Sequence, residues 1–576
     1  MRIHCFHVML ACCLSLPAAA QERIALNQDG FYPAGPKLAF VTGHLPGGPF
    51  YVLTENRADT VFKGTLGPET ASRNSSTVTR RADFSALRQA GRYVLSIPGV
   101  GVSYAFPVRA HAMEPASIAA LKGYYYLRSN MPLEVAYAGP WQRPAGHPDT
   151  AVLVHASAAD ARRPEGTVLA SPGGWYDAGD YNKYVVNSGI SVYTLLAAYE
   201  DFKPYYDTLR TGIPESSNHL PDILDEALYN LRWMLTMQDP QDGGVYHKLT
   251  NAAFDGWVKP GATTLPRYVV QKSTAATLDL AAVAAQAARI FGAFEKEAPG
   301  LADSCRRAAI AAWNWAQAHP AVLYDQDALN KRFAPPISTG TYGDNHVEDE
   351  WFWAACELYT TTKEKVYRQA LEKRISLPVS VPDWGHVQLL GYYTLLRTGA
   401  VGRPALKDSL LRLADGYVNA LQHTAFATVM GGSTKDFVWG SNAVAANQGM
   451  LLLAAYRLTH APRYALAALD NLDYLLGRNA TGYCFVTGQG SFATMHPHHR
   501  PSVSDGVVPP VPGLLAGGPN PGMQDHVHYG HTAPELAYMD DAASYASNEI
   551  AINWNAPLVY LCGGIEALQR DLGLAR

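Results

Sequence analysis

Two carboxylates, Asp177 and Asp180, lie three residues apart in a segment rich in glycine and aromatic residues. Gly179 relaxes the backbone between them, so both side chains can face one small volume and share a water molecule. Trp175 and Tyr176 flank the pair, and no basic residue lies inside the segment. Pairs with this spacing are also common in solvated turns and at helix ends. The segment alone therefore leaves both water activation and a structural turn open.

A third carboxylate, Glu549, comes directly before a long apolar segment, residues 550–568. A carboxyl at the start of a largely buried helix can have its pKa raised by desolvation, as a general acid requires. The alternative is a first-turn glutamate that the helix dipole favours, with Ser547 or Asn548 as the cap. Under the first interpretation, Glu549 would donate a proton and the aspartate pair would bind water.

Residues 495–500 contain three histidines within four positions, His496, His498 and His499, and then Arg500. This spacing lacks the i, i+4 separation by which two histidines of a zinc protease helix bind their metal. A positive arginine beside imidazoles fits hydrogen bonding to a polyol, or the steadying of a carboxylate. A solvated polar loop is the alternative.

The elements that would position these residues fall into two regions, of which the first is rich in short strands. Apolar runs separated by Gly, Pro, Asn and Asp predict strands at residues 23–27, 37–41, 50–53, 60–62, 76–79, 92–96 and 103–108. This pattern predicts an immunoglobulin-like β-sandwich over residues 21–110. The region contains neither Cys nor Trp, so any similarity to antibody domains would be architectural.

The second region, residues 116–576, has the period of helices. Residues 221–238 are a clear case, because leucines recur there at intervals of four, three and four. Similar segments begin near Ala116, Val185, Pro221, Ser273, Leu301, Val347, Glu364, Trp384, Pro404, Ala443, Ala461 and Ser547. They predict a mainly α chain whose helical hairpins close into an (α/α)6 barrel. A solenoid is less favoured because no fixed sequence period is present.

Composition excludes several classes of protein. Of the 576 residues, 48% are hydrophobic and 17% charged, which excludes a disordered chain. The formal net charge is -4, and no Lys/Arg run supplies the basic surface that nucleic-acid binding needs. The four cysteines after residue 20 are far apart and lack C-x-x-C spacing, so they predict neither a disulfide scaffold nor a zinc knuckle.

The first 20 residues resemble a secretory signal peptide, with Arg2 before an apolar stretch and an A-x-A cleavage site after Ala20. A lipoprotein signal with Cys12 as its lipidated residue is the alternative. No later stretch is apolar for the 18 or so residues that span a bilayer. We therefore expect a secreted or periplasmic protein without a membrane span.

The chain resembles glycoside hydrolase family 9, the inverting cellulases. The C-terminal signature of the family is matched at Tyr538, Asp540, Tyr545, Glu549, Ala551, Asn555 and Ala556. Residues 486–500 resemble its histidine-containing signature, and residues 174–180 resemble its base-bearing motif. Further similarity covers residues 221–226, 349–355, 439–442 and 473–477. Residues 26–28 and 91–93 resemble the immunoglobulin-like module that precedes the catalytic domain in one branch.

The resemblance implies hydrolysis of β-1,4-glucosidic bonds with inversion, without a cofactor. It assigns Asp180 as the general base, Asp177 as a residue that holds the attacking water, and Glu549 as the general acid. It also places His498, Arg500 and Asp540 around the site. Inverting glycosidases use one carboxylate to activate water and a remote carboxyl to protonate the leaving oxygen. The two catalytic carboxyl groups are about 6.5–9.5 Å apart in such enzymes. The aspartate pair and Glu549 match this set.

Three departures from the family pattern affect these expectations. Phe492 replaces a polar or basic residue, which predicts altered contacts at the subsites nearest the scissile bond. Trp554 replaces a tyrosine that often touches sugar. Some relatives with the N-terminal module hold structural zinc through two Cys and two His in the first barrel loop, but here Ser129 and Gly146 stand near the cysteine positions. Only the histidines, His147 and His155, remain, so zinc is not expected.

These observations predict a secreted endo-acting β-1,4-glucanase (cellulase) whose substrate is a β-1,4-glucan or a cello-oligosaccharide. Besides Arg500, candidate substrate-binding residues are Trp175, His247, Trp351, Trp439, Tyr545 and Trp554. Asp349 and Glu350 are candidate calcium ligands, because paired carboxylates suit a hard cation; the alternative is that they cap a helix. With no cellulose-binding module or Ser/Thr-Pro linker apparent, a soluble or amorphous glucan is favoured over crystalline cellulose.

Three other functions remain open. An exo-acting β-glucosidase or β-glucosaminidase would keep the fold and trim short oligosaccharides. A carbohydrate-binding or scaffolding protein would have a degenerate barrel, and the presence of Asp177, Asp180 and Glu549 together argues against it. An α/α-barrel enzyme such as a cyclase would lack this carboxylate set.

Overall fold

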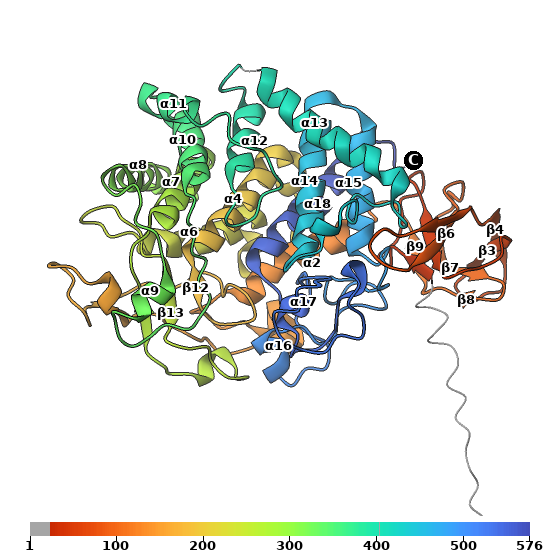
Figure 1. The fold of residues 1–576 in the computed structure, drawn as a ribbon, viewed down its shortest axis with the longest axis horizontal. Coiled ribbons are helices and arrows are strands. Elements are labelled where there is room, and N and C mark those ends of the chain that lie inside the picture. Colours follow the sequence, from red (N-terminus) through yellow and green to blue (C-terminus); the bar gives the residue numbers. More distant parts are fainter. Residues whose placement is uncertain (1–23, 403, 576) are drawn as a thin grey trace, which may run out of the picture.

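The computed structural model describes residues 24–402 and 404–575. The expected signal peptide, residues 1–20, lies outside the described residues. A small strand-rich domain at the N-terminus lies against one side of a larger helical domain (Figure 1). Among the described residues, no helix has both the length and the apolar character needed to cross a membrane.

The N-terminal domain is a sandwich of two antiparallel sheets. One sheet contains, in order, β1 (Ile24–Leu26), β2 (Leu38–Thr42), β6 (Val78–Asp83) and β5 (Glu69–Ala71). The other contains β4 (Thr60–Thr65), β3 (Pro49–Thr54), β7 (Gly91–Ile97) and β8 (Gly101–Val102), with β9 (Phe106–Val108) also paired to β7. Between the sheets the rings of Phe31, Phe84 and Phe106 pack with centroids 5.3 to 5.4 Å apart. This core confirms the predicted immunoglobulin-like sandwich. The sequence pattern did not predict the short strands β5 and β8.

The helical domain is a barrel of paired helices, as predicted. Its inner helices are buried nearly all round: α4 (Val185–Asp201), α7 (Thr274–Phe291), α10 (Glu348–Thr362), α12 (Gln388–Thr398), α14 (Ser441–Thr459) and α18 (Ile552–Leu568). The outer helices pair with them and keep more of their surface in solvent: α2 (Glu114–Leu127), α6 (Asp222–Thr236), α8 (Leu301–Ala318), α11 (Lys365–Glu372), α13 (Pro404–Ala420) and α15 (Pro462–Leu475). Amphipathic outer helices around apolar inner ones are the expected arrangement for a closed barrel.

Shorter elements connect the barrel helices. Short helices lie at α3 (Val135–Ala138), α5 (Lys203–Tyr206), α9 (Gln326–Asn330), α16 (Arg500–Ser504) and α17 (Tyr545–Asn548). Single 3₁₀ turns lie at η1 (Gly139–Trp141), η2 (Ala156–Ala158), η3 (Pro214–Ser217), η4 (Pro260–Ala262), η5 (Leu421–His423), η6 (Thr434–Asp436) and η7 (Pro534–Leu536). All four cysteines of the described residues are buried free thiols.

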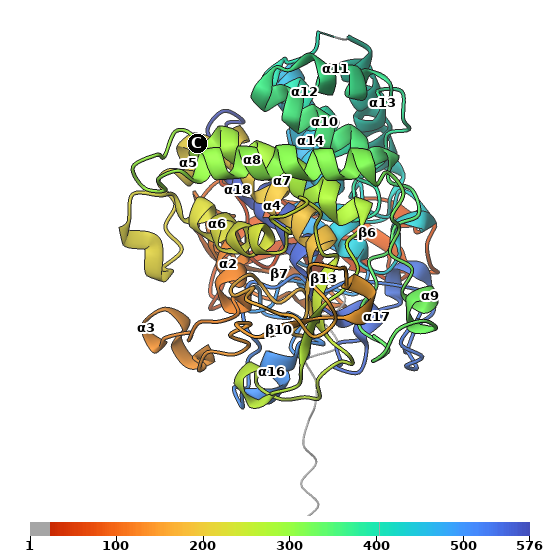
Figure 2. The same ribbon diagram turned by 90° about the vertical axis from the view of Figure 1, so that its left-hand side faces the viewer.

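A third sheet, which the sequence analysis missed, holds the loops at one end of the barrel. It contains, in order, β11 (Val168–Leu169), β10 (Val152–Val154), β14 (Arg267–Val269), β13 (Lys248–Asn251) and β12 (Lys183–Tyr184). Strand β12 begins three residues after Asp180 and pairs with β13, so the sheet fixes the loop that carries the aspartate pair. In two perpendicular views β13 and α16 lie at the same end of the barrel (Figures 1 and 2).

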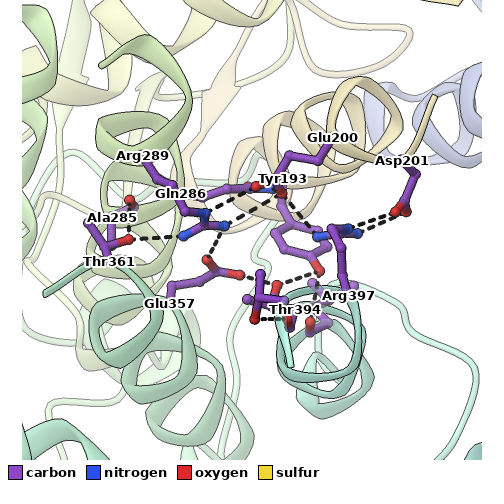
Figure 3. Close-up of polar contacts among 12 residues, drawn as sticks. Tyr193, Glu200, Asp201, Ala285, Gln286, Arg289, Glu357, Thr361, Thr394 and Arg397 are labelled. Atoms are coloured by element: carbon purple, nitrogen blue, oxygen red, sulfur yellow. Dashed lines mark hydrogen bonds and ion pairs between the residues drawn. The ribbon is translucent and has the colours of Figure 1, made fainter. Parts of the chain in front are cut away.

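Charged side chains close the opposite end of the inner ring (Figure 3). The guanidinium of Arg289 contacts Glu200 at 3.0 Å and Glu357 at 3.1 Å, while Arg397 contacts Glu200 at 3.0 Å and Asp201 at 2.9 Å. These contacts join α4, α7, α10 and α12. Because each largely buried charge has an opposite partner, the network holds the helix ends together without leaving an isolated charge in the interior.

Main-chain and side-chain hydrogen bonds clasp the two domains together. Asn27 Nδ2 donates to Asp473 Oδ1 (2.6 Å), and Gln28 Oε1 accepts hydrogen bonds from the amides of Ser491 (2.9 Å) and Phe492 (2.7 Å). Asp29 Oδ1 accepts a hydrogen bond from the amide of Gly490 at 2.9 Å. We call Asn27, Gln28 and Asp29 the interdomain clasp. It fixes the backbone a few residues before the histidine loop.

Phe492 lies at the same interface between the two domains. Its ring stacks on Tyr483 with centroids 4.1 Å apart and on Tyr104 of the N-terminal domain at 5.8 Å. This departure from the family pattern thus forms an aromatic stack between the two domains. Its expected effect on the sugar subsites stays a prediction.

Candidate active site

Asp177 and Asp180 lie in the loop between α2 and α4, and both are buried. Asp177 Oδ1 accepts a hydrogen bond from Asn187 Nδ2, and its Oδ2 accepts one from the Tyr342 hydroxyl, each at 2.7 Å. Burial raises the pKa of Asp177 to about 8, and the charge of Asp180 adds to the effect. Near neutral pH, Asp177 therefore retains a proton.

Asp180 is the more acidic member of the pair. Burial raises its pKa, but hydrogen bonds and the positive charge of Arg500 oppose the rise. Its Oδ2 accepts hydrogen bonds from Asn182 Nδ2 at 2.5 Å and from the Tyr184 hydroxyl at 3.2 Å. The negative charge of the pair thus resides on Asp180, which suits it to take a proton from water.

Glu549 is half-buried in an extended link between α17 and α18. It is not a first-turn residue of the last helix, and Ser547 and Asn548 lie in α17 without capping α18. Burial raises its pKa well above the ordinary value, and the charge of Asp180 raises it further. Glu549 therefore keeps a proton at a pH where Asp180 has lost its own, as a general acid must.

The base loop and the acid meet at Gly179. Its amide donates to Glu549 Oε1 at 3.2 Å. A Cβ atom at this position would lie 2.2 Å from the carbonyl oxygen of His498 and 3.1 Å from Glu549 Oε1. Only glycine allows the three segments to approach this closely.

His498 lies beside the acid in the histidine loop. Its amide donates to the carbonyl of Asn548 (2.9 Å), and its Nδ1 lies 2.5 Å from the carbonyl oxygen of Ala542. Burial lowers its pKa to about 4, so the ring is neutral near pH 7. Because a carbonyl only accepts hydrogen bonds, Nδ1 carries the proton and Nε2 is left as an acceptor for a sugar hydroxyl.

Arg500 and Asp540 hold this loop in place. Arg500 Nη1 donates to the carbonyl of Gly179, and its Nε donates to the carbonyl of Asp255, each at 2.9 Å. The two oxygens of Asp540 accept hydrogen bonds from the amides of Met495 and His496, each at 2.8 Å. Asp540 was predicted among the catalytic residues, but main-chain amides occupy both oxygens. It positions the histidine loop.

Three predicted substrate-binding residues are buried and cannot reach a sugar. Trp175 is fully buried, with its ring centroid 4.4 Å from that of Tyr124. Trp351 is 5% exposed and packs edge-on against Trp313 at 4.8 Å. Both nitrogens of buried His247 have partners: Nδ1 lies 2.9 Å from Ser273 Oγ, and Nε2 lies 2.8 Å from the carbonyl oxygen of Thr341. These three side chains stabilise the loops and helices around the site.

The other predicted aromatic residues lie near the acid. Trp439 is 43% exposed, its ring centroid lies 5.5 Å from that of Tyr545, and Tyr545 lies 5.8 Å from His498. Trp554 is half-buried and packs under Gly440, where a Cβ atom would come within 2.7 Å of its ring nitrogen. Trp439 and Tyr545 thus have rings available for stacking beside His498, whereas Trp554 packs against the backbone at Gly440.

The sequence analysis missed several residues of this site. Tyr342 and Asn187 are the hydrogen-bond donors to Asp177, and Tyr184 is a donor to Asp180. Trp257 lies edge-on against His498, with ring centroids 4.9 Å apart. Tyr342 and Trp257 come from other loops, and only an unusual concentration of aromatic residues in those loops could have indicated them.

Buried carboxylates surround the predicted calcium ligands. Glu350, in the first turn of α10, is fully buried, and neither of its oxygens receives a hydrogen bond. Both oxygens of buried Asp279 and Oδ2 of Asp344 likewise have no donor. Asp349 Oδ2 accepts a hydrogen bond from the amide of Val387 at 2.8 Å. Burial and mutual repulsion raise the pKa of Asp279 and Glu350. Unpaired, buried carboxylate oxygens suit a hard cation such as calcium chemically, but within residues 24–402 and 404–575 no three of these carboxylates bring their oxygens within 4.8 Å of one another.

A different acidic cluster carries its own counter-charge. Within residues 24–402 and 404–575, the carboxylate triple whose ligand atoms lie within 4.8 Å of one another is Asp160, Asp239 and Asp242. Lys272 Nζ lies 2.8 Å from Asp239 and 2.7 Å from Asp242. This cluster is therefore an ion-pair network around a lysine.

The two histidines at the expected zinc positions have other contacts here. His147 Nδ1 lies 2.9 Å from the Tyr176 hydroxyl, and His155 Nε2 lies 2.9 Å from the carbonyl oxygen of Pro335. A Cβ atom on Gly146 would lie 2.6 Å from the side chain of Pro260. A cysteine at position 146 would therefore require the loop to move.

Both domains of the chain match known protein families. Residues 115–562 match the family described as Glycosyl hydrolase family 9, and residues 19–102 match the family described as Cellulase N-terminal ig-like domain. The chain is 45% identical over 568 residues to the xyloglucan-specific endo-β-1,4-glucanase of Bacteroides ovatus, covering 97% of this chain and 96% of that protein. It is 35% identical to endoglucanase D of Acetivibrio thermocellus, covering 94% of this chain and 83% of the relative.

A solved structure of a Bacteroides ovatus family 9 protein superposes with a TM-score of 0.90 at 44% identity, covering 95% of this chain and 99% of the other. Sequence and fold thus agree over nearly the whole length of the chain. The chain belongs to glycoside hydrolase family 9.

Proposed function

We propose that this chain is an endo-acting β-1,4-glucanase that cleaves internal glucosidic bonds with inversion of configuration. The observation that carries the proposal is the meeting of the base loop and the acid at Gly179, whose amide donates a hydrogen bond to Glu549. Burial holds the proton on Glu549, while donors and Arg500 favour the charged form of Asp180. Endo-β-1,4-glucanases among its relatives support the same activity.

The attacking water is activated at the aspartate pair. Asp180 takes one proton from water, whose oxygen attacks the anomeric carbon. Asp177, whose pKa is about 8, keeps its proton near neutral pH and can hold the water by hydrogen bonding without competing for its proton. Tyr342 and Asn187 fix the orientation of the Asp177 carboxyl.

The leaving group departs from the opposite side. Glu549 gives its proton to the glycosidic oxygen as the bond from the anomeric carbon to that oxygen breaks. A single displacement by water produces an α-anomer from a β-linkage. His498 Nε2, the free acceptor beside the acid, can bind a hydroxyl of the sugar and hold the linkage near Glu549.

For the substrate, we propose xyloglucan ahead of unbranched cellulose. The support is the relative named as xyloglucan-specific, which is 45% identical over 97% of this chain, whereas endoglucanase D is 35% identical. The activity itself is tested by viscometry. An endo-acting enzyme lowers the viscosity of a soluble β-1,4-glucan quickly while few reducing ends appear. Release of monosaccharide alone with little change in viscosity would favour the exo-acting alternative.

Substrate choice is tested separately by comparing kcat/KM for xyloglucan, carboxymethylcellulose and chito-oligosaccharides under identical conditions. We expect xyloglucan to be highest and chito-oligosaccharides to be lowest. A higher value for carboxymethylcellulose would return the assignment to a cellulase.

We also propose that the protein is secreted or periplasmic, with cleavage after Ala20. Sequencing the N-terminus of the natural protein tests this, and the expected first residue is Gln21. Calcium at Asp349 and Glu350, with the buried carboxylates of Asp279 and Asp344 beside them, stays a proposal, and the ion would supply structural stability. Zinc is not proposed, because Gly146 and Ser129 supply no thiolate.

A further inference from the structure

The segment of residues 254–258, which we call the aromatic loop, exposes large rings beside the catalytic residues. Phe254 is 47% exposed and Trp257 is 46% exposed, although the other tryptophan rings near the aspartate loop, such as Trp175 and Trp233, are fully buried. Exposed aromatic rings that gather at one place on a protein surface indicate a binding site. The aromatic loop therefore requires an explanation other than core packing.

Hydrogen bonds anchor the aromatic loop to the catalytic machinery. The Tyr181 hydroxyl, next to Asp180, donates to the carbonyl of Val258 at 2.5 Å. Arg500 Nε donates to the carbonyl of Asp255 at 2.9 Å, and the Asp255 side chain accepts a hydrogen bond from Thr263 Oγ1 at 2.6 Å. Exposed rings on an anchored loop lose little conformational freedom when a ligand binds.

Trp257 reaches the immediate neighbourhood of the acid. Its ring lies edge-on against His498 at 4.9 Å, and the guanidinium of Arg500 lies 5.4 Å from the centre of the same ring. The backbone of His498 pairs with that of Glu549. One edge of Trp257 is therefore fixed against the histidine loop, while nearly half of the residue remains open to solvent.

Two separate aromatic groups contact His498. Trp257 is one, and Tyr545, which packs against Trp439, is the other. Among the described residues, no ring contact joins Trp257 to Tyr545 or to Trp439. The two groups thus share His498 as a neighbour, and the backbone of His498 pairs with that of Glu549.

We propose that Trp257 is a substrate-binding residue that stacks on a sugar ring of the glucan, across His498 from the ring bound by Tyr545 and Trp439. The proposal rests on the proposed glucanase function. The apolar face of a pyranose ring packs well on an indole, which offers a large rigid surface at low entropic cost. Because a β-1,4-glucan must extend to both sides of the bond that Glu549 protonates, two aromatic groups flanking the acid would hold the chain on both sides.

Binding without turnover tests the proposal. In the Glu549→Gln background, isothermal titration with a xyloglucan oligosaccharide or cellohexaose measures affinity directly. We expect the additional change Trp257→Ala to weaken binding on the order of tenfold, because an aromatic platform is lost. Trp257→Phe should retain most of the affinity, whereas Trp257→Leu, which keeps apolar bulk without an aromatic face, should lose it.

Leu265→Ala is the matched control. Leu265 lies seven residues after the aromatic loop and is 52% exposed. The Leu265→Ala substitution should leave the affinity for the oligosaccharide unchanged. Equal affinity of the Trp257→Ala and Leu265→Ala proteins would overturn the proposal while leaving the glucanase function intact. If the Glu549→Gln parent bound no β-glucan, both the proposed function and this inference would fail.

The position of cleavage supplies a second readout in the active enzyme. With an end-labelled oligosaccharide, Trp257→Leu should shift the preferred cleavage site, because a subsite on one side of the acid is weakened. A uniform loss of rate with an unchanged product pattern would mean that Trp257 only supports the loop, and would contradict the proposal.

Discussion

The amide of Gly179 donates a hydrogen bond to the carboxyl of Glu549, so the loop that carries the base also contacts the acid. The acid and base of an inverting glycosidase must keep a fixed separation that leaves room for water and the sugar. Here a single glycine links the two segments directly. The spacing of the carboxyls is therefore set locally, by one close contact, as well as by the barrel.

Gly179→Ala should separate these segments. The new methyl group would lie 2.2 Å from a main-chain oxygen of His498, which cannot move without its loop. We expect kcat on a soluble β-glucan to fall by about 10²-fold or more, because a positioned acid or base usually contributes a rate factor of that order. Gly48→Ala, where nothing lies within 4 Å of the added atom, serves as the control and should leave kcat unchanged. Near-normal kcat in Gly179→Ala would mean that the contact is dispensable.

The two catalytic carboxyls should respond differently to the leaving group. Asp180→Asn should abolish turnover even of an aryl glycoside with an excellent leaving group, because water must still be deprotonated. Glu549→Gln should lower turnover of the polysaccharide by about 10²–10⁴-fold but affect the aryl glycoside far less.

The stereochemistry is checked on the unmodified enzyme. Proton NMR of the first product should show the α-anomer. A β-anomer formed first would mean retention, and Asp180 could then no longer be a base acting through water.

The charge of Arg500 should set the acidic limb of the pH profile. Arg500 lowers the pKa of Asp180, and Asp180 must be ionised to accept a proton. Arg500→Met removes the charge, so the pKa of Asp180 rises and activity is lost at a higher pH on the acidic side. We expect the acidic limb of kcat/KM to move up by about one pH unit. Arg500→Lys keeps the charge, and its limb should stay close to that of the parent even where its rate is lower.

Calcium should stabilise the barrel through the buried carboxylates around α10. Adding calcium to chelator-treated protein should raise Tm, because a cation satisfies oxygens that have no donor. Glu350→Gln should remove most of that rise. Asp242→Asn, in the cluster that already surrounds Lys272, should leave it intact. Differential scanning calorimetry with and without calcium measures both, and an unchanged Tm in the parent would refute the site.

The interdomain clasp should steady the histidine loop. Gln28→Ala removes the acceptor for the amides of Ser491 and Phe492, which come shortly before His498. We expect faster hydrogen exchange in residues 490–500 and a several-fold lower kcat. Asn56→Ala, at an exposed turn whose hydrogen bonds are local, is the control. Unchanged exchange in residues 490–500 would show that the clasp does not act on the loop.

The catalytic carboxyls could be predicted from the sequence because each lies in a continuous motif. Asp177, Asp180 and Glu549 are identified by neighbours within a few positions, and the period of the helices predicts the barrel that presents them. The aspects that remained hidden depend on contacts between distant segments. Tyr342 donates to Asp177 from 165 residues away, and no local pattern marks it.

The prediction of substrate-binding residues failed mainly because several of the chosen aromatic side chains are buried. Trp351 lies on α10, an inner helix that is buried nearly all round, so an aromatic residue there has no solvent-facing side. Trp257 lies in an irregular loop whose exposure no periodicity reveals. The third sheet was missed for a related reason: its strands are only two to four residues long, and β12 pairs with a strand more than 60 residues later.

The clasp between Asn27 and Asp473 also has a consequence for how the chain is made. The two residues are 446 positions apart, so at the usual synthesis rate of about 5–20 residues per second the first waits roughly 20–90 s for its partner. During that interval the N-terminal sandwich must persist on its own core of phenylalanines. Asn27, Gln28 and Asp29 are polar, so these three side chains can stay hydrated until the barrel is complete. Docking of the sandwich is thus a late event in the biogenesis of the enzyme, and it secures the histidine loop when the barrel closes.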